Sequence, residues 1–151
     1  MFFISHRGNI SKKNKELENR PDYINSALAK NYDVEVDIWF SNNNFYLGHD
    51  GPVYLVNLDF LKKKGLWLHA KNIESLNMLV KYNFNCFWHQ NDDVTLTSKG
   101  FLWTYPGKKL LDRSICVLPE IHNIINFTSC VGICSDYIEK YKKNENKTYN
   151  F

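Results

Sequence analysis

The sequence predicts an α/β protein: a compact or truncated TIM-type (β/α) barrel with parallel strands and a small hairpin after the second strand. Three observations lead to this prediction. Short apolar, strand-like runs alternate along the chain with segments of helical periodicity. Polar residues follow these runs repeatedly at their C-terminal ends, as at the mouth of a parallel barrel. The chain has only 151 residues, whereas typical barrels have about 250, so several outer helices must be reduced to turns or the barrel must be incomplete.

We expect one domain over residues 1–141 and a polar tail over residues 142–151 that is frayed or disordered. Hydrophobic residues make up 44% of the chain, which excludes a disordered protein. The net charge of +3 is modest and argues against a nucleic-acid surface. The first residues have no basic lead, and no apolar run approaches the length of a membrane span. We therefore expect a cytoplasmic protein with no signal peptide and no membrane span, and leave its oligomeric state open.

The cysteines also fit a reducing compartment. All four lie in apolar, strand-like stretches, where buried free thiols are the usual outcome. They are Cys86, Cys116, Cys130 and Cys134. The last two lack the spacing of a zinc knuckle, so we expect no structural zinc.

The chain begins with a short buried strand over residues 2–5 that leads directly into His6-Arg7-Gly8. A histidine and an arginine at a strand end, before a flexible glycine, suit an anion site. The polar, lysine-rich residues 9–19 predict a surface loop. The spacing of apolar residues then predicts a helix over residues 23–30 that starts after Asp22.

Residues 34–40 predict the second strand, on which Glu35 and Asp37 share one face. Their Cα atoms are about 6.6 to 7 Å apart, so both carboxylates can reach one cation. The asparagines at positions 42–44 predict a turn that brings His49 and Asp50 back beside the carboxylates. The alternative is an amphipathic hairpin with a solvated acidic face.

The remaining elements alternate in the same way. Residues 58–64 predict a short helix that ends at Gly65, and residues 73–82 predict an amphipathic helix. Further strands are predicted over residues 66–71, 86–90, 101–105, 115–118 and 130–134. His69 shares a face with Trp67 and Lys71 on the first of these strands, which repeats the pattern of residues 34–40.

Four motifs in the first third of the chain, in this order and at these intervals, resemble the glycerophosphodiester phosphodiesterase family, which belongs to the phosphatidylinositol-phospholipase-C-like superfamily. These motifs are His6-Arg7-Gly8, Glu18-Asn19, Glu35-x-Asp37 and His49-Asp50. The resemblance extends more loosely to Leu68-His69-Ala70-Lys71, Trp103-Thr104 and Ser135-Asp136-Tyr137. Residues 84–134 otherwise follow the family pattern poorly, as in a short and divergent member.

The resemblance implies a metal-dependent phosphodiesterase that acts on a small-molecule phosphodiester, with one divalent cation (Mg²⁺, Ca²⁺ or Mn²⁺). It implies that Glu35 and Asp37 bind this cation. His69 stands where the family has an acidic ligand, so the site would become a mixed one that favours Mn²⁺ or another transition metal. The alternative is a His69 that is hydrogen-bonded inside the barrel mouth without touching the metal.

The remaining roles follow the same chemistry. His6 and His49 would exchange the roles of general base and general acid, because imidazole titrates near neutral pH. Arg7 and Lys71 would bind the phosphate. We expect His6→Ala or His49→Ala to abolish turnover and to leave the thermal midpoint nearly unchanged, since both residues would line a polar mouth.

A second set of residues is predicted to lie beside the site or in its pocket. Glu18 supports the site or, alternatively, the entry to the first helix, and Asp50 orients a neighbouring side chain. His89 and Trp103 line the pocket, although the tryptophans are at least as well suited to filling the core. Glu120 is a reserve candidate for the missing acidic ligand.

Two other functions fit the same residues. One is a lyase-like enzyme of the same superfamily that stops at a cyclic phosphate. The other is a non-catalytic barrel that has kept a phosphate-binding pocket. The joint presence of two histidines, an arginine and two carboxylates favours an enzyme over this last alternative.

Overall fold

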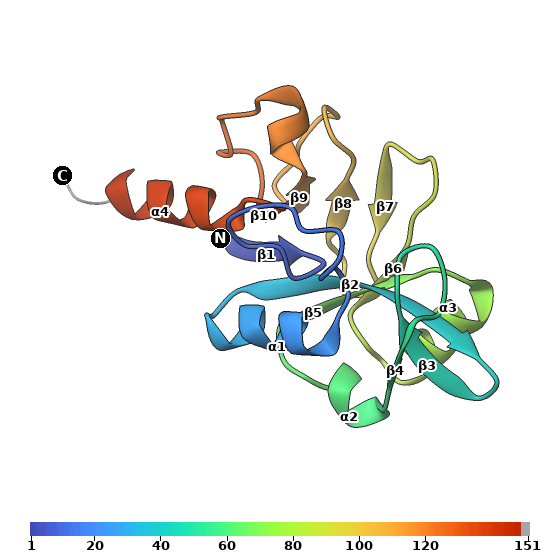
Figure 1. The fold of residues 1–151 in the computed structure, drawn as a ribbon. Coiled ribbons are helices and arrows are strands. Elements are labelled where there is room, and N and C mark those ends of the chain that lie inside the picture. The colour runs from blue at the N-terminus through green and yellow to red at the C-terminus, as the bar shows by residue number, and fades with distance from the viewer. Residues whose placement is uncertain (149–151) are drawn as a thin grey trace.

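The computed structural model describes residues 1–148 (Figure 1). Its strands are β1 (Phe2–His6), β2 (Asp33–Ser41), β3 (Asn44–Leu47), β4 (Tyr54–Val56), β5 (Leu66–Ala70), β6 (Cys86–Trp88), β7 (Val94–Leu96), β8 (Leu102–Thr104), β9 (Ser114–Val117) and β10 (Gly132–Ser135). Its helices are α1 (Pro21–Ala29), α2 (Leu58–Leu61), α3 (Ile73–Lys81), α4 (Ile138–Thr148) and the 3-10 helix η1 (Pro119–His122).

The strands form one mostly parallel sheet. Its parallel part has the order β6-β5-β2-β1-β10-β9-β8, so the first strand of the chain pairs with the last. β3, β4 and β7 extend the sheet as antiparallel strands. The predicted α/β architecture and the hairpin after the second strand are thereby confirmed.

The sheet is not closed into a barrel. Within the described residues no ladder joins β6 to β7, although single hydrogen bonds link the two segments, such as Ser98 N to Cys86 O at 2.8 Å. The connection over residues 89–93 explains the gap, because a parallel return needs a crossover of about a dozen residues. The chain therefore returns as β7, antiparallel to β8.

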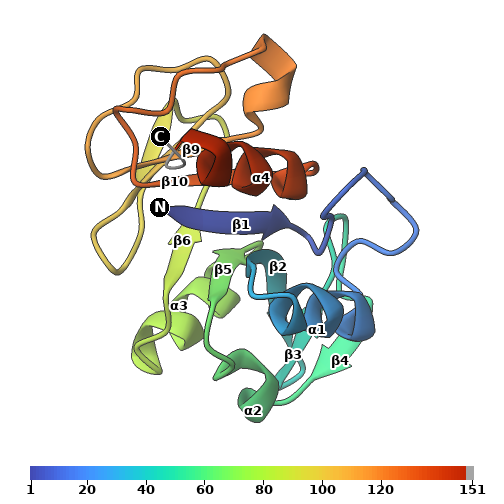
Figure 2. The ribbon, with the colours of Figure 1, turned by 90° about the vertical axis from the view of Figure 1, so that its left-hand side faces the viewer.

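Helices cover only part of this sheet. α1 packs against β2, α3 packs against β2, β5 and β6, and α4 packs against β1 and β10. Figure 1 shows loops, not helices, connecting β7, β8 and β9, and Figure 2 shows α4 lying along β1. Among the described residues, the strands β7, β8 and β9 are therefore joined by loops and not by α-helices.

Local sequence explains where the helices begin. α1 starts at Pro21, whose ring fits the first turn, and buries Ile24 and Ala27. α3 begins with a capping box between Asn72 and Ser75. α2 ends at Leu61 and is shorter than predicted, while β4 and β7 were not predicted because each pairs only three residues.

The two faces of β2 separate apolar from charged side chains. Val34, Val36 and Ile38 belong to a core that packs against the helices, and Glu35 and Asp37 lie on the opposite, inner face. The hairpin that follows turns through two asparagines in the left-handed conformation, at φ 49° and 59°.

An aromatic cluster fills the inner face below the charged residues. Phe87 stacks on Trp103 at 4.4 Å between ring centroids, and Trp67 lies 5.9 Å from Trp103. Trp103 is 4% exposed and belongs to this core. Its prediction as a pocket residue was therefore wrong, and the core interpretation is the one observed.

The C-terminal segment is helical where a frayed tail was predicted. α4 runs to Thr148, and its first turn is anchored by Ile138, which is buried against Tyr32 and Ile133, with Tyr141 packed alongside. Lys140, Lys143 and Asn144 of this helix are exposed. The last part of the predicted tail, residues 149–151, lies outside the described residues. None of the helices in the described chain is long and apolar enough to cross a membrane.

Candidate metal and phosphate site

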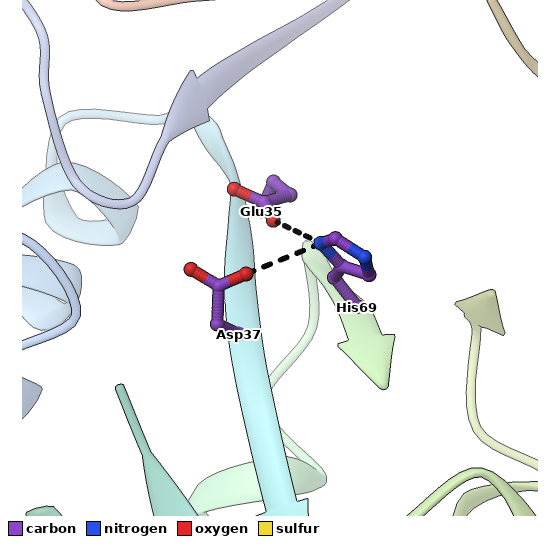
Figure 3. A group of neighbouring side chains, drawn as sticks. All are labelled: Glu35, Asp37 and His69. Atoms are coloured by element: carbon purple, nitrogen blue, oxygen red, sulfur yellow. Dashed lines mark ion pairs between the residues drawn. The ribbon is translucent and has the colours of Figure 1, made fainter. Parts of the chain in front are cut away.

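Neighbouring strand ends bring four of the predicted site residues together. His6 of β1 is in register with Glu35 of β2, and Asp37 of β2 is in register with His69 of β5. Adjacent strands are about 4.8 Å apart, so side chains in register on one face can touch. Figure 3 shows Glu35, Asp37 and His69 pointing toward one another.

Glu35, Asp37 and His69 form a buried group that fits a divalent cation. Nδ1 of His69 lies 3.1 Å from Asp37 Oδ1 and 3.4 Å from Glu35 Oε1, and one ligand atom from each residue lies within 4.8 Å of the others. Within the described part of the chain, the buried atoms Glu35 Oε2 and Asp37 Oδ1 have no hydrogen-bond partner. Ion pairs with His69, Lys71 and His6 are the contacts of these two oxygens. Buried carboxylate oxygens without a hydrogen bond are costly, and a bound cation would add a direct ligand contact. Two carboxylates and one imidazole suit Mn²⁺, with Mg²⁺ and Ca²⁺ as harder alternatives.

Electrostatics couple the imidazole to both carboxylates. Burial lowers the pKa of His69, but its contacts with Asp37 and Glu35 outweigh this effect and raise the pKa to about 9. Burial alone would raise the pKa of Asp37, yet His69, Arg7 and Lys71 hold it well below its ordinary value. Without a metal ion, a proton on His69 therefore balances part of the negative charge of the two carboxylates.

Arg7 and Lys71 each form an ion pair with a different carboxylate oxygen of Asp37. Arg7 Nε lies 2.8 Å from Asp37 Oδ2, an ion pair whose N–H is not aligned for a hydrogen bond, and Lys71 Nζ lies 3.6 Å from Asp37 Oδ1. Arg7 has the left-handed φ of 55°, and its backbone N–H donates to Glu35 O at 2.9 Å. The turn after β1 thus folds the guanidinium back over the carboxylates.

Two asparagines that we did not predict as site residues hold this arrangement. Asn19 Nδ2 donates to Asp37 Oδ2 at 2.8 Å, and the Asp37 backbone N–H donates to Asn19 Oδ1 at 3.0 Å. Asn9 Nδ2 donates to Glu18 Oε1 at 3.0 Å and to Asp136 Oδ1 at 2.8 Å. The motif Glu18-Asn19 could have indicated Asn19 as a site residue. Nothing in the pattern of the polar loop distinguished Asn9 from its neighbours.

Glu18 serves the site and not the helix entry. Its Oε2 accepts a hydrogen bond from Arg7 NH1 at 3.1 Å, and Asn9 holds its other oxygen. The N-terminal cap of α1 is Arg20, with no side-chain capping bond. The Glu18 carboxylate therefore holds one nitrogen of the Arg7 guanidinium while Asp37 holds another. This agrees with the interpretation of Glu18 as a residue that supports the site.

His6 is held by an aspartate that sequence reasoning did not assign to the site. His6 Nδ1 lies 2.7 Å from Asp136 Oδ1, which leaves Nε2 facing Glu35 Oε2 at 3.8 Å. Burial lowers the pKa of His6, but Asp136 and Glu35 outweigh it and raise the pKa above the ordinary value. The signal for Asp136 was its position directly after the last parallel strand.

Glu120 acts behind this pair and is not a metal ligand in the described arrangement. Its Oε1 accepts from the backbone N–H of Asp136 at 3.1 Å, and its Oε2 accepts from Ser135 Oγ at 2.9 Å. The prediction that Glu120 replaces the missing acidic ligand was therefore wrong. The physical reason is that η1 places it beside the turn after β10, where it fixes the backbone that carries Asp136.

His49 and Asp50 lie at the rim of the site, not beside the buried carboxylates. The hairpin does return to Asp37, since Gly48 N donates to Asp37 O at 3.2 Å. The His49 side chain is nevertheless exposed and pairs with Asp50, at 2.6 Å from Nδ1 to Oδ1. His49 and Arg7 line a common cavity of about 540 Å³.

Comparisons with protein-family models, curated proteins and solved structures find no match for this chain. The function is therefore argued from the geometry of the site. The described residues supply a buried oxygen and nitrogen donor set, two flanking cations, and two histidines that each hold a carboxylate through Nδ1. Neutralisation of an anion and transfer of protons are the chemistry that such a set can perform.

Proposed function

We propose that this protein is a metal-dependent phosphodiesterase that hydrolyses a glycerophosphodiester or a similar polyol phosphodiester by histidine acid–base catalysis. The observation that carries the proposal is the buried group of Glu35, Asp37 and His69 with His6 beside it. His6 and His69 lie at the C-terminal ends of β1 and β5, in register with Glu35 and Asp37 of β2, and α/β proteins place their sites at such strand ends.

Glu35, Asp37 and His69 would hold one divalent cation, Mg²⁺, Ca²⁺ or Mn²⁺. When bound, such a cation neutralises charge on a non-bridging phosphate oxygen. The unpartnered oxygens of the two carboxylates support this assignment.

Arg7 and Lys71 would bind the rest of the phosphate. A guanidinium has five N–H donors, and the contacts of Arg7 with Asp37 and Glu18 use only some of them. Lys71 is a second positive charge on the other oxygen of Asp37. Together they can stabilise the negative charge that grows on the phosphate during displacement.

His6 and His49 would move the protons. In the first step a substrate hydroxyl next to the phosphate attacks phosphorus; one histidine takes its proton, and the other protonates the leaving alcohol as its P–O bond breaks. Water then opens the cyclic phosphate with the two roles exchanged. The Nδ1 contacts with Asp136 and Asp50 support this proposal, because they leave both Nε2 atoms free for the reacting groups.

We further propose that the chain is a short, divergent member of the glycerophosphodiester phosphodiesterase family, and that its sheet is a trimmed barrel. The strand order supports this, since parallel strands follow in sequence and the last returns to the first. Four free cysteines support a reducing, cytoplasmic location.

The test is a panel of glycerophosphodiesters, incubated with and without Mg²⁺, Mn²⁺ and Ca²⁺ and followed by phosphorus NMR. An open monoester that appears only with a cation is the expected product. A cyclic phosphate as the end product would favour the lyase-like alternative, and binding without turnover would favour a non-catalytic phosphate-binding protein.

A matched control lies on the same strand face. Asp33 is a further carboxylate of β2, two residues before Glu35, and it accepts a hydrogen bond from Trp67 Nε1 at 3.0 Å, away from the site. Asp33→Asn should turn over substrate as the wild type does, whereas Asp37→Asn should not.

A further inference from the structure

The side chain of His89 is largely buried, and its ring nitrogens have no hydrogen-bond partner among the described residues. It follows β6 and lies two residues after Phe87, so it shares the inner face of the strand. Its side chain is only 8% exposed, and among residues 1–148 neither Nδ1 nor Nε2 has a hydrogen-bond partner. The nearest carboxylate, Asp92, is 4.0 Å from Nδ1, beyond hydrogen-bond distance.

This ring stands next to the proposed site. The ring centroids of His89 and His69 are 6.4 Å apart, and His69 Nε2 lies 3.2 Å from the backbone oxygen of His89. A second ring, that of Tyr105, lies 4.6 Å away. His89 thus occupies the β6 side of the site, whereas Arg7 and His6 occupy the β1 side.

Both ring nitrogens can take part in hydrogen bonds. An imidazole offers one N–H donor and one nitrogen acceptor when neutral, and two N–H donors when protonated. Two unpartnered polar atoms at a buried position are uncommon and call for an explanation.

The chemistry of a missing partner follows from this pair of atoms. A hydroxyl group both donates and accepts, so it can form a hydrogen bond with either nitrogen, whichever of them carries the proton. A phosphate or carboxylate oxygen only accepts, and an ammonium group only donates. The alcohol portion of a polyol phosphate carries such hydroxyl groups.

We infer that His89 is a specificity-determining residue that binds a hydroxyl group of the substrate's alcohol, so that the site selects polyol phosphates over other phosphate esters. This inference rests on the proposed function, which places the phosphate between Arg7 and Lys71. Residues 90–92, which follow His89, are polar and exposed.

The experiment measures the dissociation constants of glycerol 3-phosphate and of inorganic phosphate by calorimetry, with the same divalent cation present throughout. Wild type should bind glycerol 3-phosphate more tightly than phosphate. His89→Phe keeps an aromatic ring but removes both nitrogens, and should lose about tenfold or more of this preference. His89→Gln, which keeps a donor and an acceptor, should retain most of it.

His122→Phe is the matched control, since His122 is an exposed histidine outside the site and its replacement should leave the preference unchanged. An unchanged preference in His89→Phe would overturn the inference alone. Failure of the wild type to bind inorganic phosphate at all would overturn the proposed function as well.

A second measurement does not depend on the folding of any variant. The nitrogen NMR shifts of the His89 ring in the wild type should move when glycerol 3-phosphate is added, and should move much less with inorganic phosphate. Ring shifts that stay constant at saturating glycerol 3-phosphate would contradict a contact with the alcohol.

Discussion

Two histidine–aspartate pairs have the same local geometry and opposite surroundings. His6 and Asp136 meet at 2.7 Å and are buried, whereas His49 and Asp50 meet at 2.6 Å and are exposed. The first pair joins His6 at the end of β1 to Asp136 in the turn after the neighbouring strand β10. The second pair joins adjacent residues of one loop. The first is therefore fixed by the sheet, and the second is held only by its own backbone.

The difference shows which of the two histidines must be held in a fixed position. Buried charges must be fixed, because a misplaced charge in a low-dielectric interior is costly. Asn9 contributes by donating a hydrogen bond to the Asp136 carboxylate, and Glu120 contributes by accepting one from the Asp136 backbone N–H. In the proposed reaction, a loop histidine such as His49 can instead adjust its position to the leaving group or to water.

Removing the negative charges of the two buried carboxylates should have the largest effect on the proposed site. Glu35→Gln with Asp37→Asn should abolish cation binding and lower turnover by about 10³-fold or more, because the charge on the phosphate loses its counterion. Binding of Mn²⁺ measured by electron paramagnetic resonance, with Asp33→Asn as control, checks this. Unchanged Mn²⁺ affinity in the double variant would show that the cation binds elsewhere.

Replacing His6 and replacing His49 should have similar effects on activity but different effects on stability. His6→Ala and His49→Ala should each lower kcat by about 10²- to 10⁴-fold. Only His6→Ala should also lower the free energy of unfolding, by about 3 kcal/mol, because it removes the buried ionic partner of Asp136 and leaves that carboxylate with Asn9 and Lys13 alone. From the sequence we expected both changes to spare stability, and the burial of His6 changes this expectation for His6.

Urea denaturation and initial rates measured on the same preparations check that separation. A stable and active His6→Ala would remove His6 from the mechanism. A His49→Ala that unfolds as readily as His6→Ala would show that the rim is as rigid as the buried pair.

His69 should make cation binding depend on pH. Its pKa is raised to about 9, and an imidazole must lose its proton to bind a metal. The apparent affinity of the wild type should therefore fall about tenfold for each pH unit below that value. His69→Glu should lose this slope, keep measurable activity and shift the activating ion toward Mg²⁺ or Ca²⁺. The same slope and ion preference in His69→Ala would leave His69 outside the coordination sphere.

The smallest expected effect concerns the pH profile of stability. The pKa of His6 is raised and that of Asp136 is lowered in the folded state. Their pair should therefore contribute fully between about pH 4 and pH 6.5, the ordinary values of the two groups. Its contribution should fade as the pH rises through the folded pKa of His6.

Thermal melts of wild type and Asp136→Asn across this range provide the check. The gap between the two proteins should be largest below about pH 6.5 and shrink above it. A gap that grows with rising pH would mean that His6 is neutral when it contacts Asp136.

The sequence predicted those parts of the molecule that repeat a local period. Alternation on the second strand placed Glu35 and Asp37 on one face, and the same pattern on residues 66–71 placed His69 there, as the register of β2 and β5 confirms. The predicted starts of two helices, at residues 23 and 73, lie within two residues of the observed starts of α1 and α3.

What could not be predicted depends on contacts between distant segments. Asp136 is 130 positions from His6 in the chain, and no local pattern connects the two. The exposure of His49 follows from how the loop after β3 leaves the sheet, which turn residues alone do not determine. The gap beside β6 arises because a short connection cannot cross the sheet.

The pairing of the first and last parallel strands also has a kinetic side. Bringing β1 and β10 together closes a long loop, at an entropic cost of about 4 kcal/mol, and such long-range contacts slow folding. During synthesis His6, Glu35 and Asp37 emerge well before β10. His6 therefore acquires its aspartate only when that strand has been made and docked, so a partly synthesised chain carries Glu35 and Asp37 beside a histidine that Asp136 does not yet hold.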